Sequence, residues 1–445
     1  MSFPRYEAYK NSGVEWLGEV PEHWKTKPLW SLFNRTKRTG YSEEELLSVY
    51  RDFGVIPKSS RADNFNKPSD DLSAYQLVEV GDLAINKMKA WQGSVAISNY
   101  RGIVSPAYHV YSSQNKESSR YLHHLFRCNE YIAGYLSNSK GIRVNQWDLD
   151  PQQHSRMPIL LPPISEQQQI ARFLDRETAR IDALIAEQER LIELLKEKRQ
   201  AVISHAVTKG LDPTAPMKDS GVEWLGEVPK HWQITRIGWQ CLVGNGCTPS
   251  RDNLAYWENG DYPWLNSSKV NLERVIEADQ FVTEQALKEC ALPIVKPGTV
   301  LIAITGEGKT RGMATITEIE ATINQHLAYI EHEGINLSHD FLHDWLSANY
   351  LRLRYESEGW GSTKAAITCR DLRAFSLPLP PMSEQREICR FIKKKVSLLN
   401  ELVSQSKENV CLLQERRSAL ISAAVTGKID VRGWQAPTNA SPANC

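Results

Sequence analysis

The sequence lacks the long apolar runs and the paired cysteines that mark membrane and secreted proteins. Its longest apolar stretches, such as Thr299 to Thr305, are far shorter than the ~18 residues that cross a bilayer. The first ten residues lack the apolar core of a signal peptide. The 8 cysteines include no C-x-x-C pair and no cluster with metal-ligand spacing. We therefore expect a soluble, cytoplasmic protein with reduced thiols and no metal site.

Recognisable catalytic motifs are missing as well. The segment TGEGKT (305–310) resembles a phosphate-binding loop, but Ala303 stands where that loop needs glycine. We find no G-x-S-x-G, H-E-x-x-H or G-x-G-x-x-G motif in a strand-turn-helix context. The Asn/Asp-Pro-Pro-Tyr/Phe motif that grips a flipped adenine is also missing. The pattern favours a non-catalytic binding protein, with an enzyme of unrecognised site as an open alternative.

A net charge of either sign is absent too. Lys and Arg total 53 and Asp and Glu total 53, which excludes a polycation that binds nucleic acid by bulk charge. Any nucleic-acid surface must therefore be local. Basic and acidic residues number 20 and 17 in 1–163 but 15 and 21 in 213–380, so the latter segment is acidic. This acidity favours a rival interpretation, a duplicated coiled-coil adaptor that binds proteins and not DNA.

What the sequence does contain is an internal repeat. Residues 12–24 (SGVEWLGEVPEHW) and 220–232 (SGVEWLGEVPKHW) differ at one position of thirteen. A second block repeats PPISEQQQIARFL (162–174) as PPMSEQREICRFI (380–392). Each half is thus a leader, a divergent globular segment and a conserved segment. The 445 residues are two copies of one unit.

The two conserved segments are predicted to be long helices. Ser165 and Ser383 follow a Pro-Pro pair and precede Glu-Gln, a pattern typical of a helix N-cap. Neither segment then contains Pro or Gly before Gly210 and Gly427, so each helix runs ~40 residues, or ~60 Å. Because the second leader follows the first helix directly, the end of the second helix is expected near the N-terminus.

Apolar residues recur every seven positions along both helices, which predicts the seam of a coiled coil. Since each stripe needs an apolar partner, we expect the two helices to pack against each other in an antiparallel pair. Gln188 and Ser406 interrupt the rows at equivalent levels, and are either a register device or tolerated surface positions. The predicted seam residues are Leu174, Ile181, Leu184, Leu191, Leu195 and Val202 in the first helix and Ile392, Leu399, Leu402, Leu413 and Leu420 in the second.

The divergent segments are predicted to share one small mixed fold. Short β-rich runs at 81–88 and 103–111 precede a helical pattern at 118–136, and the second copy repeats this order. The predicted fold class is α/β (α+β), with two similar mixed α/β domains separated by two long helices and related by a pseudo-two-fold axis. The predicted division is 1–163 for the first domain, 164–210 for the first helix, 211–381 for the second domain, 382–428 for the second helix and 429–445 for a flexible tail.

Together these pieces resemble the specificity subunit of type I restriction-modification systems. The resemblance covers nearly the whole chain. One departure is that 147–163 is five residues longer from Asp-Leu to Pro-Pro than its counterpart 370–381. The matching segments are the repeated leader VEWLGEVPEHW (14–24), SVYRDFGVIPKS (48–59), GNGCTPSRDNLAYWENGDYPWLNSS (244–268), TGEGKTRGMATITEIEATINQHLA (305–328) and the two PPxSEQ helices.

The resemblance implies a non-catalytic DNA-binding subunit that recognises an asymmetric target in two parts, one with each recognition domain. It implies as partners methyltransferase subunits, two of them, and restriction subunits that serve as motor and nuclease. S-adenosylmethionine, ATP and Mg would be bound by those partners, with no cofactor in this chain. Helices packed along their length would set the spacing of the half-sites, because DNA presents equivalent groove faces about every 34 Å.

The candidate DNA contacts are loop residues in the divergent segments. Arg suits guanine, Asn or Gln suits adenine, Ser suits either base and Lys suits phosphate. The leader tryptophans Trp16, Trp24, Trp224 and Trp232 are expected in the core instead, because they lie where the copies stayed alike. The candidates are Lys89, Gln92, Arg143, Asn145 and Gln146 in the first domain, near Trp91 and Trp147, and Arg251, Asn266, Ser267, Ser268, Lys309, Arg311 and Lys364 in the second.

Overall fold

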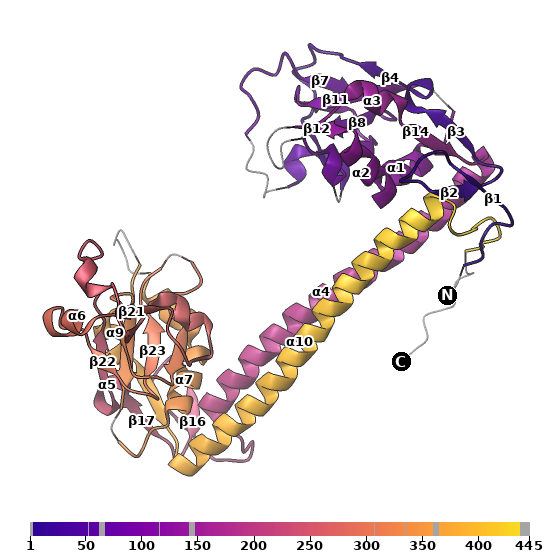
Figure 1. Cartoon of the computed structure of the whole chain (residues 1–445). Helices are drawn as coiled ribbons and strands as arrows, with labels where there is room; N and C mark the ends of the chain where they lie inside the picture. The colour runs from indigo at the N-terminus through magenta and orange to yellow at the C-terminus, as the bar shows by residue number, and fades with distance from the viewer. Residues whose placement is uncertain are drawn as a thin grey trace. The chain divides into compact units, whose positions relative to one another are not determined.

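The computed structural model forms two compact units (Figure 1). Unit 1 comprises 1–189 with 408–445, and unit 2 comprises 190–407. Each unit therefore holds one globular domain and part of each long helix, whereas the prediction divided the chain at the helix ends. The structure describes residues 3–51, 53–61, 67–114, 116–141, 147–306, 308–332, 334–358 and 365–436.

Unit 1 begins with a hairpin made from the repeated leader. Strands β1 (Tyr9–Asn11) and β2 (Glu19–Pro21) pair antiparallel. The next strand, β3 (Lys25–Pro28), pairs with β14 (Pro158–Leu161), which leads directly into the first long helix. The leader is thereby fastened to the start of that helix.

A four-stranded antiparallel sheet of order β4-β11-β8-β9 forms the centre of unit 1. The first three residues of its strand β8, Leu83, Ala84 and Ile85, are fully buried because both faces of the sheet are covered there. Leu83 and Ile85 join one core with helices α1 and α2, whereas Ala84 joins a second core with the hairpin β5-β6. The bounds are β4 Phe33–Thr36, β5 Leu47–Tyr50, β6 Gly54–Pro57, β8 Leu83–Asn86, β9 Val95–Ile97, β11 Tyr108–Ser113, α1 Ser119–Arg127 and α2 Asn129–Ser137.

Shorter elements complete unit 1. Strand β10 pairs with β7 and also meets β5 through a parallel bridge between Leu46 and Ile103. The bounds are η1 Leu29–Ser31, η2 Lys58–Ser60, β7 Gln76–Val78, η3 Ala90–Gln92, β10 Gly102–Val104, β12 Ser139–Lys140, β13 Asp148–Leu149 and α3 Pro151–Arg156.

Unit 2 contains a five-stranded sheet, β18-β26-β23-β24-β20, and a four-stranded sheet, β21-β19-β25-β22. Helices α7 and α8 pack against the first sheet with Phe341 and Trp345 in the core. The bounds are β15 Met217–Asp219, β16 Glu227–Pro229, β17 Gln233–Arg236, α5 Ile237–Gln240, β18 Leu242–Asn245, η4 Leu254–Tyr256, β19 Tyr262–Leu265, η5 Ser267–Asn271, β20 Arg274–Val275, β21 Gln280–Val282, α6 Glu284–Glu289, β22 Ile294–Val295, β23 Val300–Ala303, β24 Ala314–Thr317, β25 Ala321–Ile323, β26 Leu327–Glu331, α7 His339–Ala348, α8 Tyr350–Glu356, α9 Cys369–Ala374 and β27 Ser376–Leu379.

The two units repeat one topology, which confirms the predicted mixed α/β fold. Strands β18-β26-β23-β24 follow the same order as β4-β11-β8-β9, and β17-β27 matches β3-β14. The parallel bridge of Leu46 to Ile103 recurs as the parallel pairing of Trp264 with Thr322. This match makes β19 the counterpart of β5, although their sequences differ.

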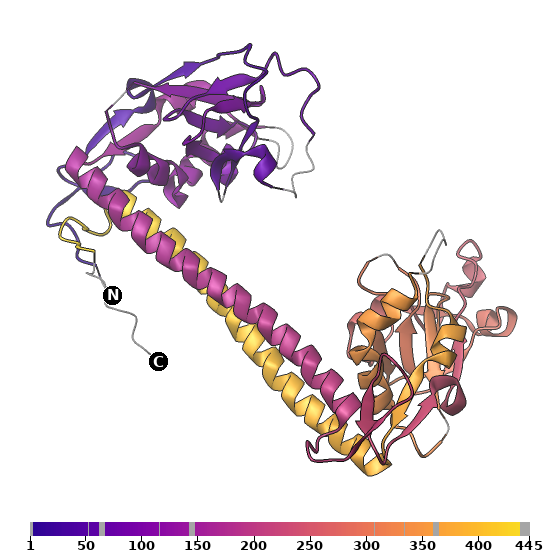
Figure 2. The ribbon, with the colours of Figure 1, turned by 180° about the vertical axis from the view of Figure 1, so that it is seen from behind.

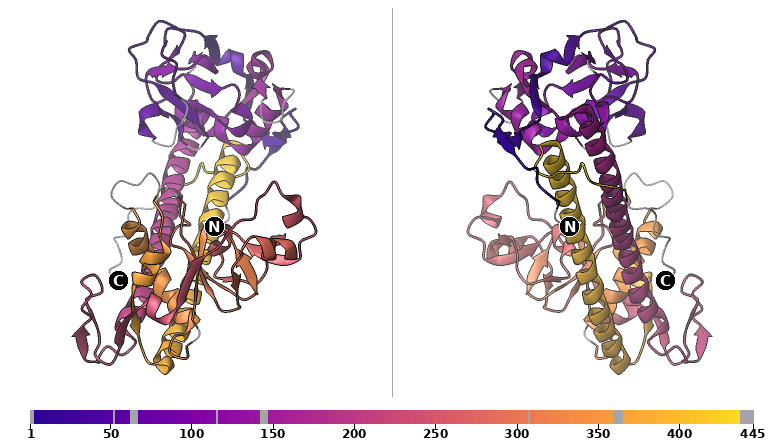
Figure 3. Two further views of the ribbon diagram at one scale, coloured as in Figure 1. Left: turned by 90° about the vertical axis from the view of Figure 1, so that its left-hand side faces the viewer. Right: turned by 90° about the vertical axis from the view of Figure 1, so that its right-hand side faces the viewer.

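The long helices are α4 (Ile164–Lys209) and α10 (Met382–Val425). Within each unit they lie side by side and run in opposite directions, as the views of Figures 2 and 3 agree. In unit 1, Arg417 binds Asp182, and in unit 2, Arg199 binds Asn400. The predicted antiparallel pairing is confirmed. In the described part of the chain, no helix is long and apolar enough to cross a membrane.

One row of the predicted seam matches the burial and the other is displaced by one residue. Leu174, Ile181, Ile392 and Leu399 are buried. Leu195, Val202, Leu413 and Leu420 are half-buried, as is Gln188, and Ser406 is buried, so both polar breaks lie in the seam. Leu184, Leu191 and Leu402 are 39–40% exposed.

The second row lies four residues after the first and not three. It contains Ile185, Ile192 and Val403, which are buried or half-buried. A heptad seam alternates steps of three and four, so an error of one step turns a row toward solvent. Arg199 and Arg417 occupy this row, and their charge disguised it in the sequence.

The repeated Ser-Glu-Gln motif fastens each helix to its own domain. The helices begin at Ile164 and Met382, so Ser165 and Ser383 lie in the first turn and are not N-caps. The buried side chain of Gln167 accepts a hydrogen bond from Ser118 N at 3.0 Å and donates one to Pro162 O at 2.9 Å. Gln385 makes the same bonds with Ser338 N and Pro380 O.

The described residues after α10 pack within unit 1, contrary to the predicted flexible tail. Val431 is fully buried, and the ring of Trp434 lies 5.3 Å from that of Phe173. Asp430 N donates to Pro4 O at 2.8 Å, so the end of α10 lies beside the N-terminal segment, as the repeat predicts. The apolar Val431 and Trp434 explain the ordering of 429–436. Residues 437–445 lie outside the described residues.

Candidate DNA interface

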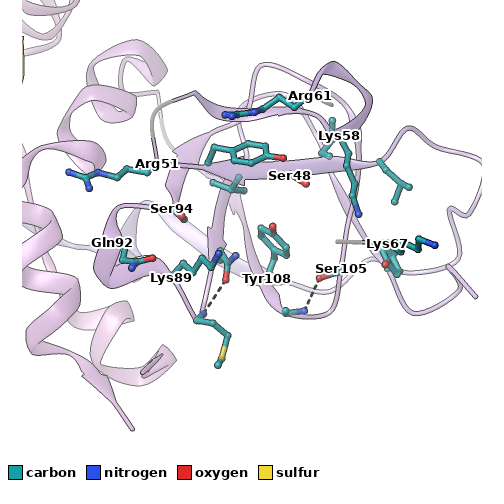
Figure 4. Close-up of a pocket in the computed structure, with 18 residues that line it drawn as sticks. Ser48, Arg51, Lys58, Arg61, Lys67, Lys89, Gln92, Ser94, Ser105 and Tyr108 are labelled. Atoms are coloured by element: carbon teal, nitrogen blue, oxygen red, sulfur yellow. Dashed lines mark hydrogen bonds between the residues drawn. The ribbon is translucent and has the colours of Figure 1, made fainter. Parts of the chain in front are cut away.

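A groove of about 740 Å³ opens in unit 1 beside strands β5, β8 and β11 (Figure 4). Three chain segments that are distant in sequence line it, 46–51 with β5, 86–94 with η3 and 105–108 at the start of β11, and Lys58, Arg61, Lys67 and Tyr75 complete the lining. Pairing of β11 with β8, and of Leu46 with Ile103, brings these segments together. The groove therefore exists only because the sheet closes over long sequence separations.

Among the described residues, the groove is lined by five cations and by no acidic side chain. Lys58, Lys67, Lys89 and Arg51 form no ion pair with any other described residue, and Lys67, Lys89 and Arg51 are exposed. The fifth cation, Arg61, lies 5.1 Å from the ring centre of Tyr50 and 4.8 Å from that of Phe53. Such a surface attracts phosphate locally, even though the whole chain is neutral.

Hydrogen-bonding side chains stand among these cations. Gln92 is exposed in the groove, whereas Ser48 and Ser94 are buried in its wall and Tyr108 is half-buried there (Figure 4). Burial raises the pKa of Tyr108, so its phenol stays protonated and can donate a hydrogen bond. Amide and hydroxyl groups of this kind distinguish the edges of bases.

The first-domain candidates divide into two groups. Lys89 and Gln92 line the groove and are exposed. Behind them Trp91 packs edge-on against Trp147 at 4.9 Å and donates from Nε1 to Met88 O at 3.1 Å, which holds the loop. The candidates Arg143, Asn145 and Gln146 lie outside the described residues. Sequence reasoning missed Ser48, Arg51, Lys58 and Lys67, which no periodic pattern marks.

Three candidates of unit 2 occupy the place that corresponds to this groove wall. Asn266, Ser267 and Ser268 follow β19 just as Ser48 to Tyr50 continue from the bridge at Leu46. Asn266 Oδ1 accepts from Ser268 N at 2.9 Å and from Ser268 Oγ at 2.6 Å, which caps the turn of η5. The Asn266 amide nitrogen has no partner among the described residues.

The neighbouring turn of unit 2 carries further polar groups that sequence reasoning missed. Thr248 bonds Gln325, and Thr305 Oγ1 lies 2.7 Å from His326 Nδ1. Gly246 lets this turn approach closely, because a Cβ there would collide with the Ile323 carbonyl. His326 is at the level of Ala107 in unit 1, since both come just before the strand that pairs with β23 or β8.

The guanidinium of Arg251 stacks on two tryptophan rings, one of which belongs to β19. The guanidinium lies 3.6 Å from the ring centre of Trp257 and 4.9 Å from that of Trp264. Nη2 donates to Gln280 Oε1 at 2.7 Å, and the side chain remains exposed. Stacking fixes the plane of a guanidinium, which favours bidentate recognition.

The remaining candidates of unit 2 have different surroundings. Lys309 is exposed on a loop that Tyr350 and Arg354 hold, by bonds of 2.6 Å to Lys309 O and Gly308 O. Arg311 lies in a turn, as predicted, but it is only 3% exposed and pairs with Glu358 at 3.3 Å, so its side chain does not face solvent as a DNA contact would require. The two residues of this ion pair are 47 positions apart, so no local sequence pattern predicts the pairing. Lys364 lies outside the described residues.

The leader tryptophans pack inside the units, as the sequence predicts. Trp24 and Trp232 are fully buried. Trp16 packs on Tyr131 at 5.2 Å and Trp224 on Phe375 at 5.3 Å. Glu166 anchors the leader of unit 1 by accepting from Tyr6 OH at 2.6 Å and Trp24 Nε1 at 3.0 Å. These rings stabilise the joint between leader and helix and do not line the groove.

Comparison with known proteins supplies a family. The model for the type I restriction modification DNA specificity domain matches twice, at 21–194 and 229–411. The type I restriction enzyme EcoKI specificity subunit of Escherichia coli K12 is 20% identical over 94% of this chain and 92% of its own length. The EcoR124I/EcoR124II specificity subunit of Escherichia coli is 24% identical over 62% of this chain and 64% of its own.

The likeness extends to the fold. A solved chain of a type I restriction-modification system matches with a TM-score of 0.67 at 18% identity, covering 91% of this chain and 98% of that one. The two family matches coincide with the two copies of the internal repeat, each spanning a domain and part of a long helix. The chain therefore belongs to the type I restriction modification DNA specificity domain family.

Proposed function

We propose that this chain recognises an asymmetric, two-part DNA sequence, with each unit binding one half-site. The chain contributes recognition and no chemistry, and it directs methyltransferase and restriction subunits to the site. S-adenosylmethionine, ATP and Mg are then bound by those partners. A cytoplasmic location follows from the role, because the DNA target is found there.

The observation that carries this proposal is that the two units share one strand topology but carry different polar side chains at the matching strand edges. Unit 1 presents Lys89 and Gln92, whereas unit 2 presents Asn266 and Arg251 near the corresponding strand edge. The framework that positions them repeats, but the hydrogen-bonding groups differ. Two unlike half-sites are the natural ligands of such a pair.

The acidity of the second domain is compatible with this role. Several of its cations are already engaged inside unit 2: Lys269 with Asp279 at 2.9 Å, and Arg311 with Glu358 at 3.3 Å. Affinity from phosphate contacts is therefore expected to come mainly from unit 1, with unit 2 contributing base contacts. The methyltransferase subunits would add further phosphate contacts.

The partner assembly is proposed as two methyltransferase subunits on one chain. The support is the internal repeat, which presents the leader hairpin and a long helix twice. Two similar surfaces suit two copies of one partner.

A footprint on the assembled complex tests the function. The chain with its methyltransferase subunits should protect two short DNA segments with an unprotected spacer. Changing either segment should abolish protection. Binding that ignores DNA sequence would instead support the rival adaptor, in which the helices and domains bind proteins alone.

A further inference from the structure

A hollow of about 350 Å³ lies between α4 and α10 within unit 2. Its floor contains Leu195, Leu399 and Val403, the same apolar seam that joins the helices. Cations stand around it and no acidic residue lines it. The lining consists of Leu195, Lys196, Arg199, Leu399, Asn400, Val403, Ser404 and Lys407.

The internal repeat supplies a comparison for this hollow. Shifting each number by 218 leads to the equivalent positions of unit 1, where Asp182 replaces Asn400, Glu189 replaces Lys407 and Gln414 replaces Lys196. Only the arginine is kept, as Arg417. The site therefore carries three cations in unit 2, but one cation and two acids in unit 1.

The two arginines show what the seam position binds. Arg417 grips the Asp182 carboxylate with two bonds, from Nε at 2.8 Å and from Nη2 at 3.2 Å. Arg199 has only the amide oxygen of Asn400, at 3.1 Å from Nη1, and forms no ion pair with a described carboxylate. Lys407 forms none either, and Lys196 pairs only with the exposed Glu193. Two N–H groups of a guanidinium match the two oxygens of a carboxylate. The described residues of unit 2 supply Arg199 with an amide oxygen in place of a carboxylate.

We infer that the unit 2 hollow binds a carboxylate side chain from an acidic segment of a methyltransferase subunit. The inference rests on the proposed function for the identity of the partner. The apolar floor of Leu195, Leu399 and Val403 favours a protein segment, since it can bury an aliphatic neighbour of the acid. Duplex DNA presents charged phosphates at its surface, and its apolar groups lie inside the grooves, where they would not reach that floor.

This site makes the two partner contacts unequal. At the corresponding place in unit 1 the arginine is already neutralised by Asp182, and Glu189 would repel an acidic segment. One methyltransferase copy should therefore bind the helix pair more tightly than the other, and more tightly at low salt.

The test gives the unit 2 hollow the acidic residues found at the equivalent positions of unit 1. The double variant Asn400→Asp and Lys407→Glu gives unit 2 both acidic side chains of unit 1 and leaves Lys196 in place. The matched control, Asp182→Asn with Glu189→Lys, makes the reverse exchange at the same two positions of unit 1. Affinity for the methyltransferase subunit is measured on the full-length chain across a salt series, with thermal unfolding as a check on folding.

We expect the unit 2 variant to bind one of the two methyltransferase copies about tenfold more weakly at low salt. The affinity of that copy should also depend less on salt concentration. The control should keep both binding events. If Asn400→Asp with Lys407→Glu fails to fold, Lys196→Glu supplies the same charge change at the rim. Wild-type affinity in a folded variant overturns the inference and leaves the proposed function intact. A wild-type chain that binds no methyltransferase overturns both.

Discussion

Removing the three groove lysines should weaken DNA binding by a predictable amount. The variant replaces Lys58, Lys67 and Lys89 with Ala, since all three line the unit 1 groove without an acidic partner among the described residues. Each phosphate contact contributes about 0.9 to the slope of log affinity against log salt. At 0.15 M salt one such contact is worth about fivefold in affinity, so three are worth about a hundredfold.

The assay is fluorescence anisotropy with duplex DNA at several salt concentrations, on the chain assembled with its methyltransferases. We expect the slope to fall by about 2.7 in magnitude for three lost contacts. The control replaces Lys25, Lys27 and Lys116, which are exposed in the same unit but do not line the groove. Equal losses from both triple variants, or no change in slope, would refute the assignment of the groove to DNA.

Three further predictions concern the framework. Gln167→Ala should lower the free energy of unfolding of unit 1 by about 2 kcal/mol, seen in chemical denaturation, because Ser118 N loses a buried acceptor; an unchanged midpoint would contradict the anchoring role. Gly427→Ala should cost more than Gly210→Ala in the same assay, since both have φ near +75° but only at Gly427 would a Cβ collide with the Pro21 ring; equal costs would argue against that packing. Burial lowers the pKa of His154 to about 3, so the stability that its neutral form contributes is complete above pH 6.5 and is lost as the pH falls from there toward 3, by about 1.4 kcal/mol per unit. His154→Phe should flatten that slope in pH-dependent denaturation, and an unaltered slope would show that other groups control it.

The sequence predicts the framework well because the framework is periodic or repeated. The long helices follow from a heptad pattern and from the lack of Pro and Gly before Gly210 and Gly427. The mixed domains follow from short β-rich runs. The prediction of the second seam row is wrong by one residue because Arg199 and Arg417 belong to that row. In a sequence, a charged residue indicates a surface position even when its partner lies on the other helix.

The site is predicted less completely because tertiary pairing creates it. Lys89 and Gln92 were found from loop chemistry alone, but Lys58 and Lys67 join them only through the strands that bridge Leu46 to Ile103. Arg311 is a residue type that often contacts DNA, but it pairs with Glu358 and its side chain is buried. Val431 shows the opposite error, because its segment is rich in turn residues but packs into unit 1.

The central claim is that each unit recognises its own half of the target. The most direct measurement is a map of methylated DNA motifs in cells carrying a hybrid chain, with residues 25–157 taken from a relative. We predict a modified motif in which one half-site is new while the other half-site and the spacer are retained. Alteration of both half-sites, or of neither, would contradict the account.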